Sequence, residues 1–213
     1  MIIEQLQFTE QQRLSKFGLD GFFTKTLDCL RDELQRLRTT IYNYNQHEYI
    51  FALNERAWVG AFNNAILRAF PDSSVTLQEF GVYNKSSFVG RADFLVYWKD
   101  KDGIPLYLLF EAKQYEEVNK TEMLDDTADY LNIIRTQGQK YFDAEIETEY
   151  YKDKKVFIIP IAFGWIRKPG YLTVAKKYFE QSEKKDNSTD FCSLYYEGDN
   201  GAWAYGKVYD ARK

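Results

Sequence analysis

The sequence predicts a single α/β domain, in which a mixed β-sheet is flanked by helices. The chain has 213 residues, of which 45% are hydrophobic and 28% are charged, which is enough apolar material for one buried core. Segments with helical periodicity alternate with short runs rich in β-branched and aromatic residues. We find no internal repeat, low-complexity tract or linker, so the chain is expected to fold as one unit over residues 1–213.

The expected elements follow one another as helices, helix, three strands, helix, strand, helix and two strands. Helical spacing predicts helices over residues 9–38, interrupted near Gly18 and Gly21, and over 53–70, closed by Pro71. Strands are predicted over residues 75–82, 91–98, 106–113 and 156–163, the last buried on both faces although it contains Pro160. The remaining expected elements are helices over 121–147 and 172–182 and a closing hairpin of 191–196 with 203–209, turned by residues 198–201. These elements divide into a helical extension (1–49), a core (50–165) and a C-terminal helix and hairpin (166–213).

Composition excludes several classes of protein. No apolar run approaches the ~20 residues of a membrane helix, and the N-terminus lacks the order of a signal peptide, so a cytoplasmic protein without membrane contact is expected. Cys29 and Cys192 lie far apart and make no metal or redox spacing. With His47 as the single histidine, a zinc site or a Ser-His-Asp triad has little material. Catalysis would have to use carboxylates, lysines and a hard cation.

The formal net charge of −4 argues against a protein that coats nucleic acid by charge alone. It does not exclude an enzyme, because a carboxylate-rich site is neutralised only when its cations bind. The 17 Tyr, 16 Phe and 4 Trp residues are expected mainly in the core, with a minority free to stack on bases.

Residues 91–113 predict a hairpin that brings two carboxylates together. A three-residue loop, Lys101-Asp102-Gly103, with glycine in the left-handed conformation, is a common hairpin closure. Counting back from this loop puts Asp93 opposite Glu111, with Cβ atoms about 5 Å apart on one face. A two-residue loop would put Asp93 on the other face, so this prediction depends on the turn. Opposed carboxylates repel unless a positive group lies between them, and a divalent cation fits.

Lys113 lies two residues beyond Glu111 and is therefore expected on the same face of its strand. The run before it, residues 106–110, is apolar on both faces, as a central strand should be. Charged side chains that converge at the end of such a strand are costly to bury singly and are more simply explained as a site. The alternative is a solvated charged face, which explains most Asp…Glu-x-Lys combinations.

Ala92-Asp93, eighteen residues before Glu111-Ala112-Lys113, resembles the motif of the PD-(D/E)XK nuclease superfamily. The expected element order over residues 53–163 resembles that superfamily's core, which implies a restriction-endonuclease-like core within residues 50–165. The resemblance implies that Asp93 and Glu111 bind the metal, that the Ala112 carbonyl joins them, and that Lys113 positions the attacking water and stabilises the transition state. Ala92 departs from the proline of the motif.

Four further residues are candidates for the same site. Glu55 shares a helical face with apolar residues and resembles the first-helix glutamate that many superfamily members place beside the metal; the alternatives are a helix-dipole or ion-pair role. Gln137 and Tyr141 stand at i and i+4 and resemble the Gln-x-x-x-Tyr signature of the RecB-like exonuclease branch, although a coincidental match stays open. Gln114 is a further polar candidate.

Oxygen ligands point to Mg²⁺, with Mn²⁺ as a substitute, and to metal-dependent hydrolysis of phosphodiester bonds, with DNA favoured over RNA. Contacts to the phosphate backbone could come from Arg91, Lys85, Arg167 and Lys168, each of which is equally well explained as a surface residue.

Two alternatives stay open. The first is a catalytically silent nuclease-like fold that acts as a nucleic-acid-binding or scaffolding module. The second is a sequence-specific restriction enzyme, although residues 1–49 and 171–213 are the only spare length. A protein partner or a homodimer is compatible with either, and the absence of an ATPase motif means that any motor would be a separate chain.

Overall fold

The computed structural model of the chain describes residues 2–44, 53–84, 87–114, 127–145, 153–166, 169–182 and 189–213. His47, Lys85, Arg167 and Lys168 lie outside these ranges, as do both ends of the helix expected over residues 121–147. No described helix is long and apolar enough to cross a membrane.

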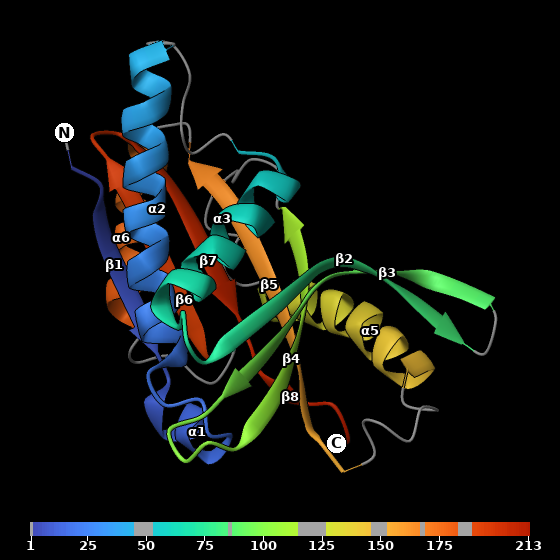
Figure 1. The fold of residues 1–213 in the computed structure, drawn as a ribbon. Coiled ribbons are helices and arrows are strands. Elements are labelled where there is room, and N and C mark those ends of the chain that lie inside the picture. The colour runs from blue at the N-terminus through green and yellow to red at the C-terminus, as the bar shows by residue number, and fades with distance from the viewer. Residues whose placement is uncertain are drawn as a thin grey trace.

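The described strands form one mixed sheet of eight strands in the order β1-β6-β7-β5-β4-β3-β2, with β8 pairing beside β7 on β5 (Figure 1). The strands are β1 (Glu4–Thr9), β2 (Ser74–Asn84), β3 (Ser87–Lys99), β4 (Pro105–Gln114), β5 (Lys155–Ile166), β6 (Phe191–Glu197), β7 (Asn200–Gly206) and β8 (Tyr209–Asp210). Among the described pairings only β4–β5 is parallel. A parallel pair needs a crossover, and the segment between these strands contains the helix α5 (Thr127–Glu145).

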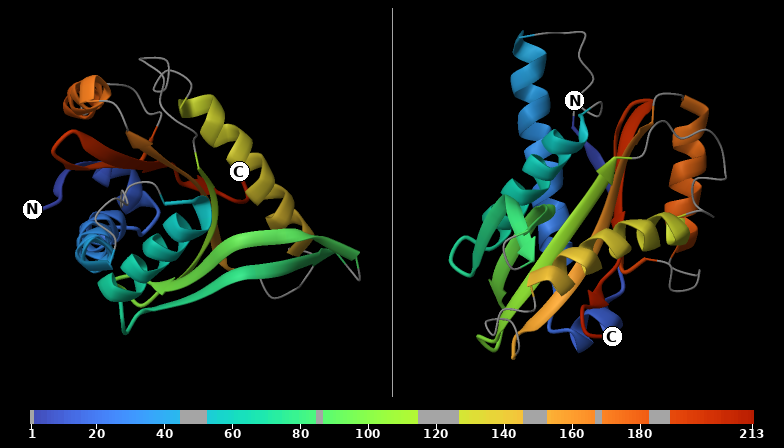
Figure 2. Two further views of the ribbon diagram at one scale, coloured as in Figure 1. Left: turned by 90° about the horizontal axis from the view of Figure 1, so that it is seen from above. Right: turned by 90° about the vertical axis from the view of Figure 1, so that its right-hand side faces the viewer.

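Helices cover both faces of the sheet, as the two turned views of Figure 2 show. One face carries α1 (Gln11–Lys16), α2 (Phe22–Tyr44) and α3 (Glu55–Ala69), and the other carries α5 and α6 (Pro169–Ser182). Alternate residues of the central strands face opposite ways: Phe110 packs toward α3, whereas Leu109 packs in the cluster that includes Tyr141 of α5. The predicted α/β class with a helix-flanked mixed sheet is therefore confirmed.

The sequence predicted a helical extension over residues 1–49. The extension is only partly helical, because β1 precedes its helices. β1 pairs antiparallel with β6 and so forms the edge of the sheet. Its alternation of Leu6 and Phe8 with Gln5 and Gln7 has the period of a strand: the apolar pair packs against the cluster beneath α6. Because β1 is short and its partner strand β6 lies at the other end of the chain, the alternation alone did not predict a strand.

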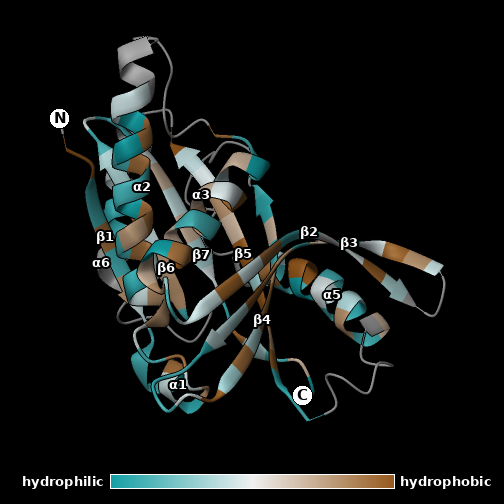
Figure 3. Ribbon diagram, in the orientation of Figure 1, coloured by the Kyte–Doolittle hydropathy of each residue, from teal (hydrophilic) through white to brown (hydrophobic). Residues whose placement is uncertain are grey.

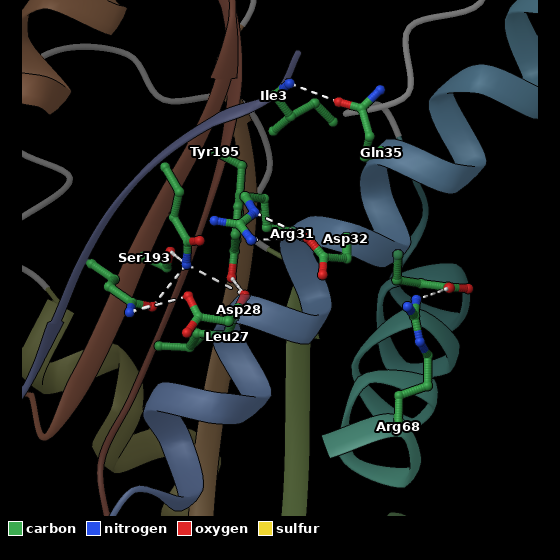
Figure 4. A network of polar contacts seen from close by, with 12 residues as sticks. Ile3, Leu27, Asp28, Arg31, Asp32, Gln35, Arg68, Ser193 and Tyr195 are labelled. Carbon is green, nitrogen blue, oxygen red and sulfur yellow. Dashed lines mark hydrogen bonds and ion pairs between the residues drawn. The ribbon is translucent and has the colours of Figure 1, made fainter.

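Polar contacts attach β1 and β6 to α2 (Figure 4). The amide of Gln5 donates to Ser193 Oγ of β6 at 3.0 Å and to the carbonyl oxygen of Leu27 in α2 at 3.3 Å. The buried Tyr195 hydroxyl donates to the same carbonyl at 3.1 Å. Apolar residues of α2 face the sheet and polar ones face out, which gives the helix its brown and teal sides in Figure 3. The terminal segments thus build part of the central layer of the domain.

Pro160 is tolerated inside β5 because the strand changes partner there. β8 pairs with Phe157 and Ile158, whereas β7 begins pairing at Ile161. The carbonyl of Pro160 accepts the Lys207 amide at 3.3 Å, so the side that lacks an N–H faces the gap between these two partners. The expected strand buried on both faces is confirmed.

The turn between β3 and β4 has the geometry that the sequence predicted. Gly103 has φ +76°, and its amide donates to the carbonyl of Asp100 at 3.0 Å. The Asp100 carboxylate also accepts the amides of Asp102 and Ile104. The ladder runs from Lys99 opposite Pro105 to Phe94 opposite Phe110, which is the register of the three-residue loop.

Because the register depends on this turn, Gly103→Ala should lower the free energy of unfolding by about 1–2 kcal/mol, the cost of a left-handed conformation for a residue with a Cβ. Gly60→Ala is the matched control: it lies inside α3 with no atom within 4 Å of a new Cβ, and it should raise stability by about 0.5–1 kcal/mol. Urea denaturation measures both changes. A neutral Gly103→Ala would show that the left-handed turn does not set the register.

Candidate active site

The site lies where β3 separates from β4. The β3–β4 ladder ends at Phe94 opposite Phe110, and the β2–β3 ribbon then bends away while β4 continues (Figure 1). Continued register would put Asp93 opposite Glu111, as predicted. Backbone groups at a point of separation lose their ladder partners and need others. Here the two acidic side chains supply them.

Asp93 and Glu111 join the separating strands through reciprocal contacts. The Asp93 carboxylate accepts the backbone amide of Ala112 at 2.6 Å. The backbone of Asp93 in turn favours the charged form of the Glu111 carboxylate and opposes the rise of its pKa. Both carboxylates therefore help to end the ladder, which is a structural role that holds whether or not a ligand binds.

Glu111 is buried, with 1% of its surface exposed, beneath helix α5. Gly138 allows the close approach of this helix: a Cβ there would lie 2.7 Å from Ile158 Cγ2 and 3.8 Å from Glu111 Cβ. Burial, followed by repulsion from Asp93, raises the pKa of Glu111 to about 8. Among the described residues, none is hydrogen-bonded to its Oε2 atom. A buried carboxylate oxygen in this condition is a position for a cation or a proton.

Asp93 is also held in an environment that disfavours its charge. Burial raises the pKa of its carboxyl group, while the Ala112 amide and the Lys113 ammonium oppose the rise. Two carboxyl groups with raised pKa values on adjacent strands are typical of functional sites, because structural carboxylates are usually paired fully.

Lys113 lies between two acidic side chains. Its Nζ atom is 3.6 Å from Glu55 Oε1 and 3.8 Å from Glu111 Oε1. Partial burial opposes the ammonium form, but the carboxylates of Glu55, Asp93 and Glu111 outweigh it and raise the pKa of Lys113. The lysine is therefore charged, and it belongs to the same group of side chains as both predicted metal ligands.

Glu55 attaches the start of α3 to the end of β4. Asn54 caps the helix by accepting the Ala57 amide at 2.9 Å. The Glu55 carboxylate accepts the backbone amide of Gln114 at 3.0 Å through Oε2, while Oε1 faces Lys113. The ion-pair alternative for Glu55 is thus realised within the site itself. Gln114 donates its side-chain amide to the Leu53 carbonyl, so this candidate supports the chain before α3.

Gln137 and Tyr141 contact each other on α5, where the Gln137 amide donates to the Tyr141 hydroxyl at 3.0 Å. Tyr141 packs on Gly90 of β3, where a Cβ would lie 2.7 Å from its ring. Among the described residues neither side chain is hydrogen-bonded to Asp93 or Glu111. The pair is on the helix that covers Glu111, and its part in a RecB-like site stays a prediction.

In the part of the chain that is described, no group of three or more His, Cys, Asp or Glu side chains is arranged to hold a metal ion. Two carboxylates, Asp93 and Glu111, lie together, while Glu55 is separated from Glu111 by Lys113. The Ala112 carbonyl faces the same side of β4 as its amide, toward the gap left by β3, because the two groups of one strand residue point the same way. The available protein ligands are therefore two carboxylates and this carbonyl.

Glu79 also lies in the region of the site, although no sequence pattern indicated it. It lies opposite Asp93, between the pairs Gln78–Phe94 and Phe80–Ala92, and has φ +45°, the only described non-glycine residue with positive φ. Its carboxylate lies 3.6 Å from Arg56 Nε and 3.9 Å from Arg91 Nη1. The register between β2 and β3, which no sequence pattern fixed in advance, was the missing information.

Comparison with protein-family models, with curated proteins and with solved structures gives no match to this chain.

The buried charge of Glu111 predicts a pH-dependent stability. Because its folded pKa of about 8 exceeds the value of 4.5 expected when unfolded, the carboxylate lowers fold stability progressively as pH rises from 4.5 to 8. Glu111→Gln should therefore raise the melting temperature in EDTA at pH 8, and the gain should shrink toward pH 5. Glu10→Gln, whose carboxylate makes no capping bond, is the control. A gain that is equal at both pH values, or a loss at pH 8, would contradict the assigned pKa.

Proposed function

We propose that this chain is a divalent-metal-dependent nuclease that hydrolyses phosphodiester bonds, with DNA favoured over RNA as the substrate. One observation carries the proposal: Asp93 and Glu111 meet where two strands separate, and no residue of the described ranges is hydrogen-bonded to the buried Oε2 atom of Glu111. Lys113, adjacent to both in the same group, supplies the positive charge that phosphodiester chemistry requires.

The residues fit Mg²⁺ or Mn²⁺ by the chemistry of their donor atoms. Carboxylate and carbonyl oxygens are the ligands that these hard cations prefer, and Mg²⁺ usually retains several waters, so two carboxylates and a carbonyl suffice. A cation between Asp93 and Glu111 would remove the repulsion that raises their pKa values. Cys29 on α2 and Cys192 on β6 are remote from the site in the fold.

When bound, the cation would supply an activated water and neutralise charge on the phosphate. The protein's own residues would do the rest. Asp93 and Glu111 would hold the cation at the gap between β3 and β4. Lys113 is a compact charge suited to the oxyanion that develops during hydrolysis, and Glu55 positions its ammonium group. Glu55 is thus proposed to act through Lys113 more than as a direct ligand.

The alternative is a nuclease-like fold that binds or scaffolds without cleavage. In its favour, the contacts of Asp93 with Ala112 and of Glu55 with Gln114 stabilise the fold by themselves. Against it stands the cost of burying the Glu111 carboxylate without a full set of partners. A restriction enzyme with separate recognition elements is disfavoured, because both terminal segments contribute strands to the central sheet.

If the two carboxylates share a cation, Mg²⁺ or Mn²⁺ at about 100 times its Kd should stabilise the protein by about 2.7 kcal/mol, which is roughly 5–10 °C in melting temperature. Asp93→Asn and Glu111→Gln should each abolish this rise, whereas Asp72→Asn, an exposed change after α3, should preserve it. Differential scanning fluorimetry with metal or EDTA measures the shift. An equal metal-induced rise in the melting temperature of the wild type and all three variants would contradict a cation site shared by Asp93 and Glu111.

Cleavage is tested with labelled single- and double-stranded DNA and RNA. The wild type should cleave with Mg²⁺ or Mn²⁺ and stop with EDTA, while Ca²⁺ should support binding better than turnover. Lys113→Ala should lower kcat about 10²–10³-fold and preserve the metal-induced rise in melting temperature, because lysine is not a ligand. Lys99→Ala, at the exposed end of β3, is the control.

Two outcomes would count against the proposal. Wild-type protein that binds neither metal nor nucleic acid would favour the scaffold alternative. A Lys113→Ala protein that loses metal affinity together with its fold would make the lysine structural.

A further inference from the structure

Two arginines and one glutamate meet at the rim of the site. Glu79 of β2 lies between Arg56 of α3 and Arg91 of β3, with N–O distances of 3.6 and 3.9 Å. All three side chains are exposed, at 84% for Arg56, 67% for Arg91 and 50% for Glu79. Each of three separate elements thus contributes one side chain to a charged cluster that faces solvent.

This group is adjacent to the proposed catalytic residues along each of the three elements. Arg56 follows Glu55 in the first turn of α3, Arg91 precedes Asp93 by two residues in β3, and Glu79 lies opposite Asp93 in the β2–β3 register. The Glu79 charge also reaches Asp93, where it helps to raise the pKa of that carboxyl group. A polyanion that reached Asp93 would therefore pass these arginines.

The contacts within the group are too weak to be a structural bridge. Exposed ion pairs at such distances contribute roughly 0–1 kcal/mol. Glu33 offers the contrast, because it is 3% exposed and contacts Arg36 at 2.7 Å and Arg68 at 3.3 Å, joining α2 to α3. Arginines held only loosely can exchange a carboxylate for a phosphate, which they bind in the same bidentate geometry.

The conformation of Glu79 indicates that its position is imposed by its surroundings. A φ of +45° is unfavourable for a residue with a long side chain, and it occurs at the register position opposite Asp93, where β3 leaves β4. The bend that opens the site therefore also brings the Glu79 carboxylate between the two arginines.

We propose that Arg56 and Arg91 form a clamp for backbone phosphates of a nucleic acid next to the cleaved bond, and that Glu79 neutralises this clamp until the substrate displaces it. The proposal rests on the proposed nuclease function and assigns the clamp residues of that site. This clamp also explains how a chain with a net charge of −4 can bind a polyanion. The positive charge of the two arginines is local, and it becomes available when the substrate displaces Glu79.

The test is binding of a fluorescein-labelled DNA oligonucleotide in Ca²⁺ over a range of salt concentrations, together with cleavage of the same oligonucleotide in Mg²⁺. Arg56→Ala and Arg91→Ala should each weaken binding about 3–10-fold and lower the slope of log K against log salt by about one. In cleavage they should raise KM with little change in kcat. Glu79→Gln should tighten binding about 2–5-fold at low salt, because it removes the competing carboxylate while keeping the side chain's size.

Arg31→Ala is the matched control, since Arg31 is an exposed arginine paired with Asp32 on α2. If the Arg56→Ala/Arg91→Ala double variant has the Kd and salt slope of Arg31→Ala while the wild type cleaves, the clamp is overturned and the nuclease function stands. If Glu79→Gln weakens binding, the proposed role of Glu79 as a counter-ion that the substrate displaces is overturned. A wild type that neither binds nor cleaves in any metal would instead remove the proposed function, and the clamp with it.

Discussion

The structure depends on one constraint: β3 and β4 must separate while Ala92 of β3 and Glu111 of β4 stay buried beside the point of separation. At that point the ladder loses backbone partners, and the carboxylates of Asp93 and Glu111 replace them. Two acidic groups so close together, one of them almost fully buried, need positive charge or protons nearby. Lys113 supplies part of it from β4. The surrounding elements are arranged around this need, with α3 attached through Glu55 and α5 lying close through a glycine.

A purely structural explanation accounts for much of this arrangement but not for all of it. Strand ends can be closed with neutral side chains or with turns, at no cost in buried charge. Here one oxygen of the Glu111 carboxylate has no hydrogen-bond partner in the described part of the chain, and the pKa of the group is raised to about 8. Natural proteins hold such unfavourable groups mainly where function needs them, since a well-packed apolar residue would stabilise the fold more.

The sequence predicted what depends on local information. The three-residue loop before Ile104 fixes the β3–β4 register, and the loop and both strands are contiguous, so the approach of Asp93 to Glu111 followed from counting. Partners that are distant in sequence could not be found this way. β1 pairs with β6 from the opposite end of the chain, and the positive φ of Glu79 arises from a bend in the sheet. The Lys113 contact with Glu55 likewise required the packing of α3 against β4.

The proposed function requires a divalent cation between the separating strands, at the Glu111 Oε2 atom that no described residue hydrogen-bonds. Anomalous diffraction from crystals grown with Mn²⁺ tests it most directly, because the signal locates the ion without reference to activity. We expect one anomalous peak at about 2.0–2.3 Å from oxygens of Asp93 and Glu111 and from the Ala112 carbonyl, with waters completing the coordination. A peak elsewhere, or no peak while Glu111 Oε2 is hydrogen-bonded to a protein donor, would contradict it.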